Sequence, residues 1–207
     1  MKKKLDLQQQ SGESEVVVPM IPEATKPSFT ERMQQKYADL KAKPSQMRTV
    51  HNLKFIVLGD RGVGKTYLCE ALPYNKAVKI SSGLVQVSAD EQVKVELHDS
   101  VDNHLPPSFL KGAIAALLVY EVSSRESFDG VREWFQRAVE IASSQMLILM
   151  VAMNKDGIDR AVPTSEGQGL ANELGLLHFE VSERWESLNV IEFAVKDIFT
   201  GVQSGKF

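Results

Sequence analysis

The amino-acid sequence predicts an α/β fold, with a mostly parallel sheet of six strands and helices on both faces. Short apolar runs alternate with amphipathic segments from Asn52 onward, and two of the runs, "AIAALLVYEV" and "MLILMVAM", are apolar almost throughout. Strands of this kind are buried on both faces, as in parallel sheets that helices cover. A glycine-rich turn, "GDRGVGKT", lies between the first apolar run and a helix-like segment. Such a turn is typical of parallel α/β folds that bind ligands at the carboxyl ends of their strands.

Each element follows from a local pattern. Alternating or continuous apolar patterns predict strands over residues 53–59, 83–89, 93–99, 113–122, 146–153 and 176–182. Amphipathic patterns predict one helix that begins at Gly64 and others over 126–142, 165–175 and 186–202. The second and third predicted strands are joined by a tight "DEQ" turn, so we expect them to form the one antiparallel pair.

Composition bounds the class of protein. The 207 residues predict one domain with extensions, and 43% hydrophobic and 25% charged residues are typical of a soluble globular protein. A net charge of −3 argues against nucleic acid as a partner, because duplex binding relies on many basic contacts to phosphate. The single cysteine, Cys69, cannot form an intramolecular disulfide, which favours a reducing, cytoplasmic location.

The chain divides into four predicted parts. Residues 1–29 are polar and contain prolines, which predicts disorder. Residues 30–51 predict a short helix followed by a linker, and we expect the helix to dock on the domain or on a partner. Residues 52–202 form the predicted domain, and 203–207 a short tail. No apolar run has transmembrane length and no cysteine stands near the C-terminus, so we expect no direct lipid anchor. Any association with membranes would then be peripheral and through partners.

The turn "GDRGVGKT" matches the phosphate-loop pattern G-x-x-x-x-G-K-[S/T]. Its glycines allow backbone N–H groups to point at a phosphate, and the following helix adds the positive end of its dipole. In this pattern the lysine reaches the β- and γ-phosphates of a nucleotide, and the hydroxyl binds Mg²⁺. The predicted phosphate-binding residues are Gly59, Asp60, Arg61, Gly62, Val63, Gly64, Lys65 and Thr66.

The middle of the chain resembles the Rab family of small GTPases within the Ras superfamily. In Rab proteins an R-G-A segment leads into a buried strand ending in V-Y-D, then T-x-x-E-S-F, then a helix with a tryptophan. The matching stretches here are 111–113, 119–121, 123–128 and Trp134. The resemblance covers roughly residues 52–202. It implies a Ras-like P-loop NTPase fold, bound GTP or GDP with Mg²⁺, and effector or regulator proteins that dock on the switch regions.

The resemblance also suggests which residues lie on the metal side of the site. Asp99 fits the family's Mg²⁺-supporting aspartate and Thr66 the loop hydroxyl. Either Ser81 or Ser82 could substitute for the switch threonine, Ser81 being the one that aligns if the glycine is fixed, and a solvated pair of loop serines is the alternative. The family pattern D-T-A-G-Q becomes "DSVDN". Asp102 therefore replaces a glycine that meets the γ-phosphate, and its carboxylate would repel phosphate. Asn103 replaces the water-positioning glutamine and is a candidate for that catalytic role.

The guanine-reading motif N-K-x-D of the family appears as "MNKDG". Two alignments are possible. If Asn154 and Lys155 hold their family places, one residue is missing before Asp156. If the strand is aligned without a gap, Asp156 is correctly placed and Met153 stands where the asparagine belongs. Both alignments keep Asp156 as the guanine reader.

The last family motif, S-A-K, appears as "SER" over residues 182–184. The family's alanine presents its backbone N–H to the guanine oxygen. Glu183 takes that place, and a backbone N–H is present whatever the side chain, so Ser182 and Glu183 complete the predicted guanine-binding set.

These features predict a divergent Rab-like GTP/GDP switch in vesicle or ciliary-type trafficking, with slow intrinsic GTP hydrolysis. A second hypothesis is a pseudo-GTPase scaffold that keeps the fold as an interaction module. Compared with Rab proteins the switch segments are short, because Gly112 follows Asp99 by 13 positions and Asp99 follows Lys65 by 34. These short segments, Asp102 and the altered guanine motif favour the scaffold, whereas the intact phosphate loop favours binding. A P-loop ATPase or kinase is a third possibility, but the downstream signatures of those classes are missing from the sequence.

Overall fold

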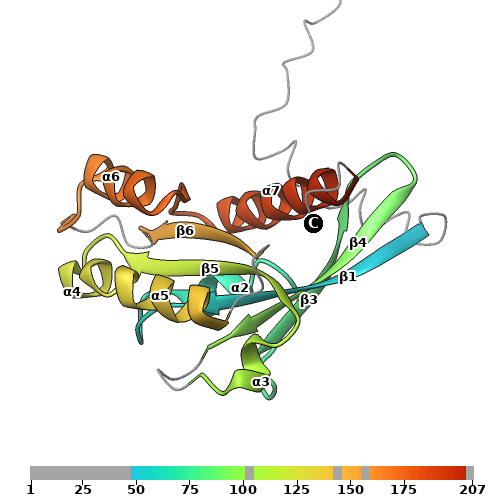
Figure 1. Cartoon of the computed structure of the whole chain (residues 1–207), viewed down its shortest axis with the longest axis horizontal. Helices are drawn as coiled ribbons and strands as arrows, with labels where there is room; N and C mark the ends of the chain where they lie inside the picture. The colour runs from blue at the N-terminus through green and yellow to red at the C-terminus, as the bar shows by residue number, and fades with distance from the viewer. Residues whose placement is uncertain (1–47, 101–104, 142–145, 155–158, 204–207) are drawn as a thin grey trace, which may run out of the picture.

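The computed structural model describes residues 48–100, 105–141, 146–154 and 159–203. The predictions for residues 1–47 and for the tail at 204–207 lie outside these ranges. Within the described residues the strands form one sheet in the order β2-β3-β4-β1-β5-β6-β7 (Figure 1). The strands are β1 (Arg48–Leu58), β2 (Tyr74–Asn75), β3 (Ile80–Gln86), β4 (Glu91–Asp99), β5 (Ala113–Glu121), β6 (Leu147–Met153) and β7 (Leu177–Val181).

The sheet is mostly parallel, which confirms the predicted class. Strand β1 pairs in parallel with β4 and β5, and β6 pairs in parallel with β5 and β7. Strand β3 is antiparallel to β4 and to β2. The sheet therefore has seven strands in the described residues. The prediction of six strands is wrong because it did not include β2. Two residues are too few to produce a visible apolar pattern, so Tyr74–Asn75 could not be recognised in the sequence.

Helices cover both faces of the sheet. The helices α2 (Lys65–Cys69) and α7 (Arg184–Gln203) contribute to one core cluster, with the side chains of Phe55, Val57, Val95 and Leu97 from the strands. Helices α3 (Pro107–Leu110), α4 (Arg125–Asp129), α5 (Val131–Ile141) and α6 (Thr164–Leu174) contribute to the other cluster. Figure 1 shows α7 on one side of the sheet and α4 and α5 on the other. The continuous apolar runs of β5 and β6 are buried because both of their faces are covered.

The predicted helix over 126–142 is instead two helices that meet at Gly130. Helix α4 is capped by Ser124, whose side chain accepts a hydrogen bond from the backbone N–H of Ser127. The N–H of Gly130 donates to the carbonyl of Glu126 and ends α4. A side chain at Gly130 would have its Cβ 3.0 Å from a carboxylate oxygen of Asp60, so the absence of a side chain there lets α4 and α5 approach the phosphate loop.

The bounds of β1, β3 and β4 differ from the predicted ones. Strand β1 starts at Arg48, four residues before the predicted domain, because Arg48 pairs with Glu91 at the start of β4. Residues 48–51 are therefore strand rather than linker. Strand β3 starts at Ile80, so Ser81 and Ser82 pair with β4 and do not lie in a loop. The turn between β3 and β4 falls at residues 87–90.

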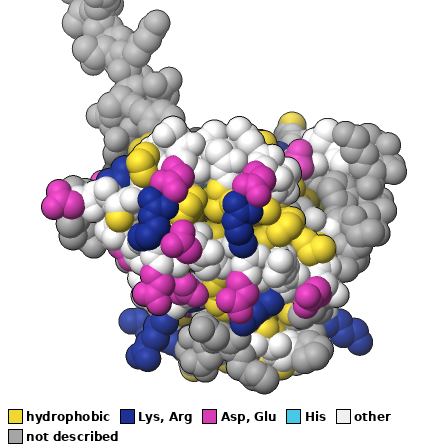
Figure 2. Space-filling model, turned by 60° about the vertical axis from the view of Figure 1, so that its left-hand side comes forward, with side chains coloured by type: hydrophobic (Ala, Val, Ile, Leu, Met, Phe, Trp, Pro, Cys, Tyr) yellow, Lys and Arg dark blue, Asp and Glu magenta, His cyan; other side chains and the backbone are white. Residues whose placement is uncertain are grey.

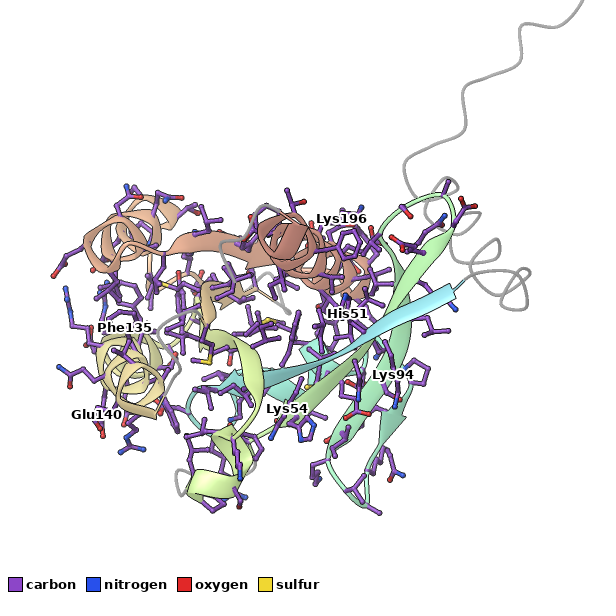
Figure 3. All side chains as sticks on the ribbon, turned by 45° about the vertical axis from the view of Figure 1, so that its right-hand side comes forward. His51, Lys54, Lys94, Phe135, Glu140 and Lys196 are labelled. Atoms are coloured by element: carbon purple, nitrogen blue, oxygen red, sulfur yellow. The ribbon has the colours of Figure 1, made fainter. Side chains whose placement is uncertain are left out.

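The two faces of the sheet differ in polarity near β1 and β4. Along β4 the apolar residues Val93, Val95 and Leu97 belong to the core cluster that includes α2 and α7, and the alternate positions carry polar side chains. In Figure 3, Lys54 and Lys94 lie on the side of the sheet opposite Lys196 of α7. The Nζ of Lys94 forms an ion pair with Glu96 at 2.6 Å.

Helices α4 and α5 are joined to α6 by surface ion pairs. Arg125 pairs with Glu166, and Arg132 pairs with Glu173 through two hydrogen bonds of 2.7 and 2.6 Å. Figure 2 shows that acidic and basic side chains are interspersed on the face it presents. Among the described helices, none is both long and apolar enough to cross a membrane.

Candidate nucleotide-binding site

The turn between β1 and α2 adopts the backbone that its glycines predict. Gly59, Gly62 and Gly64 have φ angles of 144°, 90° and 98°. Gly64 is the residue that caps the N-terminus of α2, and Lys65 and Thr66 begin the helix. Positive φ is open to glycine and costly for other residues, so this loop conformation depends directly on the sequence pattern.

Lys65 is held inside the loop. Its side chain is buried, and its ammonium donates hydrogen bonds to the carbonyl oxygens of Gly59 at 2.8 Å and of Asp60 at 2.6 Å. These contacts fix the position of a positive charge before any ligand arrives. A charge positioned in this way binds an anion with little further loss of conformational freedom.

A second group of side chains lies at the carboxyl end of β4. The hydroxyl of Thr66 donates to a carboxylate oxygen of Asp99 at 2.6 Å, and the hydroxyl of Tyr74 donates to the same oxygen at 3.1 Å. Burial and the neighbouring Asp99 raise the pKa of Tyr74 to about 12, so its hydroxyl stays protonated and continues to donate. The Thr66 and Asp99 oxygens are of the kind that Mg²⁺ prefers, and they lie side by side.

These groups line one cavity of about 380 Å³. Among the residues that the structure describes, its lining carries three basic side chains, Arg61, Lys65 and Lys79, and one acidic side chain, Asp99. A concave surface with this excess of positive charge attracts anions, and basic side chains with loop N–H groups are the donors that phosphate oxygens use. The cavity therefore suits a phosphate chain.

Ser81 lies elsewhere. It belongs to β3, is fully buried beside the Cys69 thiol, and is not part of the cavity lining. Antiparallel pairing of Ser81 with Leu97 places its side chain on the core side of the sheet. The structure thus brings Thr66 and Asp99 together as predicted, but leaves the predicted third oxygen ligand, Ser81, outside the site. Lys79, which the sequence analysis did not single out, lines the cavity instead.

The residues predicted to read a base lie at the ends of β6 and β7. The backbone N–H of Asn154 donates to the carbonyl of Val181 at 2.7 Å, and its side-chain amide donates to Glu180 at 3.4 Å. Lys155 and Asp156 lie outside the described residues, as do Asp102 and Asn103, so their predicted roles stay predictions.

The backbone N–H groups of Ser182 and Glu183 already have an acceptor. Both donate to one carboxylate oxygen of Glu186, at 2.6 and 2.9 Å. Glu186 stands in the first turn of α7 and folds back onto the residues before it, an arrangement known as a capping box. A guanine oxygen that used the Glu183 N–H would compete with this carboxylate. Position 183 carries glutamate instead of the usual Ser, Thr, Asp or Asn, so only half of this helix-start signal was visible in the sequence.

A sequence model of the Ras family matches residues 54–202, well over half of the chain. The chain belongs to the Ras family. This confirms the predicted superfamily and fold, and it supports a small GTP-binding protein with a P-loop. Ras-family proteins generally bind GTP or GDP with Mg²⁺ and act through effectors and regulators.

In this Ras-family protein the phosphate loop is also tied to α5. The indole Nε1–H of Trp134 donates to a carboxylate oxygen of Asp60 at 2.9 Å. Trp134 is 4% exposed, so the bond is shielded from water. No local signal in the sequence links Trp134 to Asp60, because the two residues lie 74 positions apart.

We predict that Trp134→Phe lowers the free energy of unfolding by about 1–3 kcal/mol, since a hydrogen bond to a charged group and some packing are lost. Urea denaturation of the single variants Trp134→Phe and Asp60→Ala and of the double variant separates the two contributions. The hydrogen bond predicts a coupling energy of about 1–2 kcal/mol between the sites. Strictly additive losses would mean that only the packing of the indole matters.

Proposed function

We propose that this Ras-family protein is a divergent Rab-like GTP/GDP switch that acts in intracellular trafficking and hydrolyses GTP slowly. The observation that carries the proposal is the pairing of a buried Lys65, seated in the phosphate loop, with a hydrogen-bonded Thr66 and Asp99 across the same cavity. A strand-to-helix turn without a ligand has no need of a buried ammonium next to two metal-ligand oxygens.

Different residues would bind the phosphates and the metal ion. Backbone N–H groups of the loop and Lys65 would hold the phosphates, and Thr66 with Asp99 would hold Mg²⁺. When bound, Mg²⁺ supplies positive charge to the phosphate oxygens. Tyr74 keeps the Asp99 carboxylate in place through its hydroxyl. In this proposal Asn103 positions water less well than the family's longer glutamine, which accounts for slow hydrolysis.

Partners would dock on the switch side. The segment between β2 and β3 exposes Val78, which is 58% accessible, and β3 exposes Leu84, which is 41% accessible. Apolar side chains on a surface whose conformation follows the phosphate state are suited to effector binding. In this proposal any association with a membrane is peripheral and made through such partners.

A pseudo-GTPase scaffold is the second candidate. The observation that favours it is that the Glu186 carboxylate already accepts from the Glu183 N–H, which a guanine oxygen would use, and from the neighbouring Ser182 N–H. In a scaffold these N–H groups serve only to start α7, and partner binding does not respond to nucleotide.

The experiment that separates these functions begins with chromatography of nucleotides released from the purified, full-length protein. Labelled GDP, GTP and ATP are then titrated with and without Mg²⁺, and single-turnover cleavage of GTP is followed. A switch binds guanine nucleotides in preference to ATP, and its partner affinity differs between the GDP and GTP forms. A protein that carries no nucleotide and binds none refutes the switch and leaves the scaffold.

A further inference from the structure

Lys79 has an unusual backbone conformation. It is the last residue before β3, and with a φ of 56° it is the one non-glycine residue with positive φ in the described ranges. For an L-residue the left-handed region costs roughly 1–2 kcal/mol. Strain of this kind persists only where neighbouring contacts impose it, and it is frequent at ligand sites.

The neighbouring contact is made by Asp99. Its backbone N–H donates to the carbonyl of Lys79 at 2.9 Å, which extends the pairing of Ile80 with His98 by one position. Asp99 is also the residue whose carboxylate accepts from Thr66. The backbone of Lys79 is therefore attached to the metal side of the cavity, where the family's switch threonine is expected and Ser81 is not found.

The side chain of Lys79 brings a charge to that position. It lines the cavity together with Lys65 and Arg61. Lys65 is engaged by loop carbonyls, whereas no ion pair or hydrogen bond of the Lys79 ammonium is found among the residues that the structure describes. A partly buried lysine beside an anion-attracting cavity gains most when a phosphate is present.

We propose that Lys79 is a phosphate-binding residue that contacts the nucleotide from the metal side and makes binding less dependent on Mg²⁺. The inference rests on the proposed function, since it assumes that the cavity takes a nucleoside di- or triphosphate. Two lysines on opposite sides of a phosphate chain neutralise part of the charge that a divalent cation neutralises elsewhere in the family. The lysine takes the place of a hydroxyl ligand, so metal affinity falls while phosphate affinity is retained.

The test is an equilibrium titration of full-length protein with fluorescent GDP, in Mg²⁺ and in excess EDTA. Lys79→Asn removes the charge, and asparagine tolerates positive φ, so the turn is kept. Lys79→Arg restores the charge. Lys76→Asn is the matched control, because Lys76 is exposed in the same turn and does not line the cavity.

We expect the unchanged protein to lose less than about tenfold in GDP affinity on removal of Mg²⁺. In EDTA, Lys79→Asn should bind GDP roughly tenfold more weakly than the unchanged protein, which is the loss expected of one charged hydrogen bond. Lys79→Arg should recover most of that loss, and Lys76→Asn should bind normally. Two outcomes refute the role of Lys79 and leave the proposed function standing. In the first, the unchanged protein binds GDP in Mg²⁺ but loses more than about 100-fold in GDP affinity in EDTA. In the second, Lys79→Asn binds GDP as well as Lys76→Asn does. If no nucleotide binds in either condition, the role of Lys79 and the proposed function are both refuted.

Discussion

Replacing Gly59 with alanine is expected to destabilise the protein by about 3–5 kcal/mol. A Cβ atom at this position would lie 2.1 Å from the carbonyl oxygen of Val119, and the φ of 144° is unfavourable for any residue with a side chain. The contact cannot be relieved locally, because Val119 lies in the central strand β5, whose carbonyls are fixed by the ladder. Domains of this size have a total stability of about 5–15 kcal/mol, so the loss is a large share of it. Urea denaturation of the two proteins measures the difference.

Gly112→Ala is the matched control for Gly59→Ala. Gly112 also has a positive φ, 75°, but a Cβ there meets no atom within 4 Å. Its substitution should cost only the backbone strain, about 1 kcal/mol. Equal losses for the two variants would show that the close approach of β5 to the phosphate loop does not constrain Gly59.

Lys65→Met is expected to reduce GDP and GTP affinity by roughly 100-fold, the upper end of the range for a lost hydrogen bond to a charged group, because this ammonium is buried and already positioned. Methionine keeps a long apolar side chain in the buried site but removes the ammonium that the carbonyls of Gly59 and Asp60 position. The same change should lower the free energy of unfolding by about 1–3 kcal/mol, because those carbonyls lose a charged donor. Titration with fluorescent nucleotide and urea denaturation measure the two effects separately.

Lys94→Met provides the comparison for Lys65→Met. Lys94 is 44% exposed in its side chain, pairs with Glu96 on β4, and does not line the cavity. Its substitution should leave nucleotide affinity unchanged. Unaltered binding by Lys65→Met would mean that the buried ammonium serves only to hold the loop.

The parts of the candidate site whose positions follow from the sequence are those determined by local patterns. The glycines, lysine and threonine of the phosphate loop act within eight consecutive residues, and the strand before them and the helix after them follow from apolar periodicity. Asp99 was placed correctly because it directly follows a clear strand pattern. Buried strands such as β5 and β6 are equally evident, since continuous apolar runs of that length have few alternative structures.

The remaining features depend on contacts between distant residues or on register. Trp134 and Asp60 meet only because α5 packs against the loop side of the sheet. Ser81 was assigned to the metal side because it precedes a glycine as the family threonine does, but an earlier start of β3 turned its side chain into the core. A shift of one residue in a strand exchanges its two faces, so the face on which the Ser81 side chain lies could not be predicted before the pairing of β3 with β4 was known.

The shortness of α2 affects how the phosphate site opens. Its five residues form little more than one turn, and a helix of that length does not persist by itself. It is held from outside by Arg184 at the start of α7, which pairs with Glu70 at 3.0 Å and lies over the ring of Tyr67. The amides around Lys65 and Thr66 should therefore exchange with solvent through local opening, at a lower free energy than the amides of the central strands. A ligand that binds only the closed turn slows this exchange in proportion to its affinity, so the exchange rate of a single helical turn reports the occupancy of the whole site.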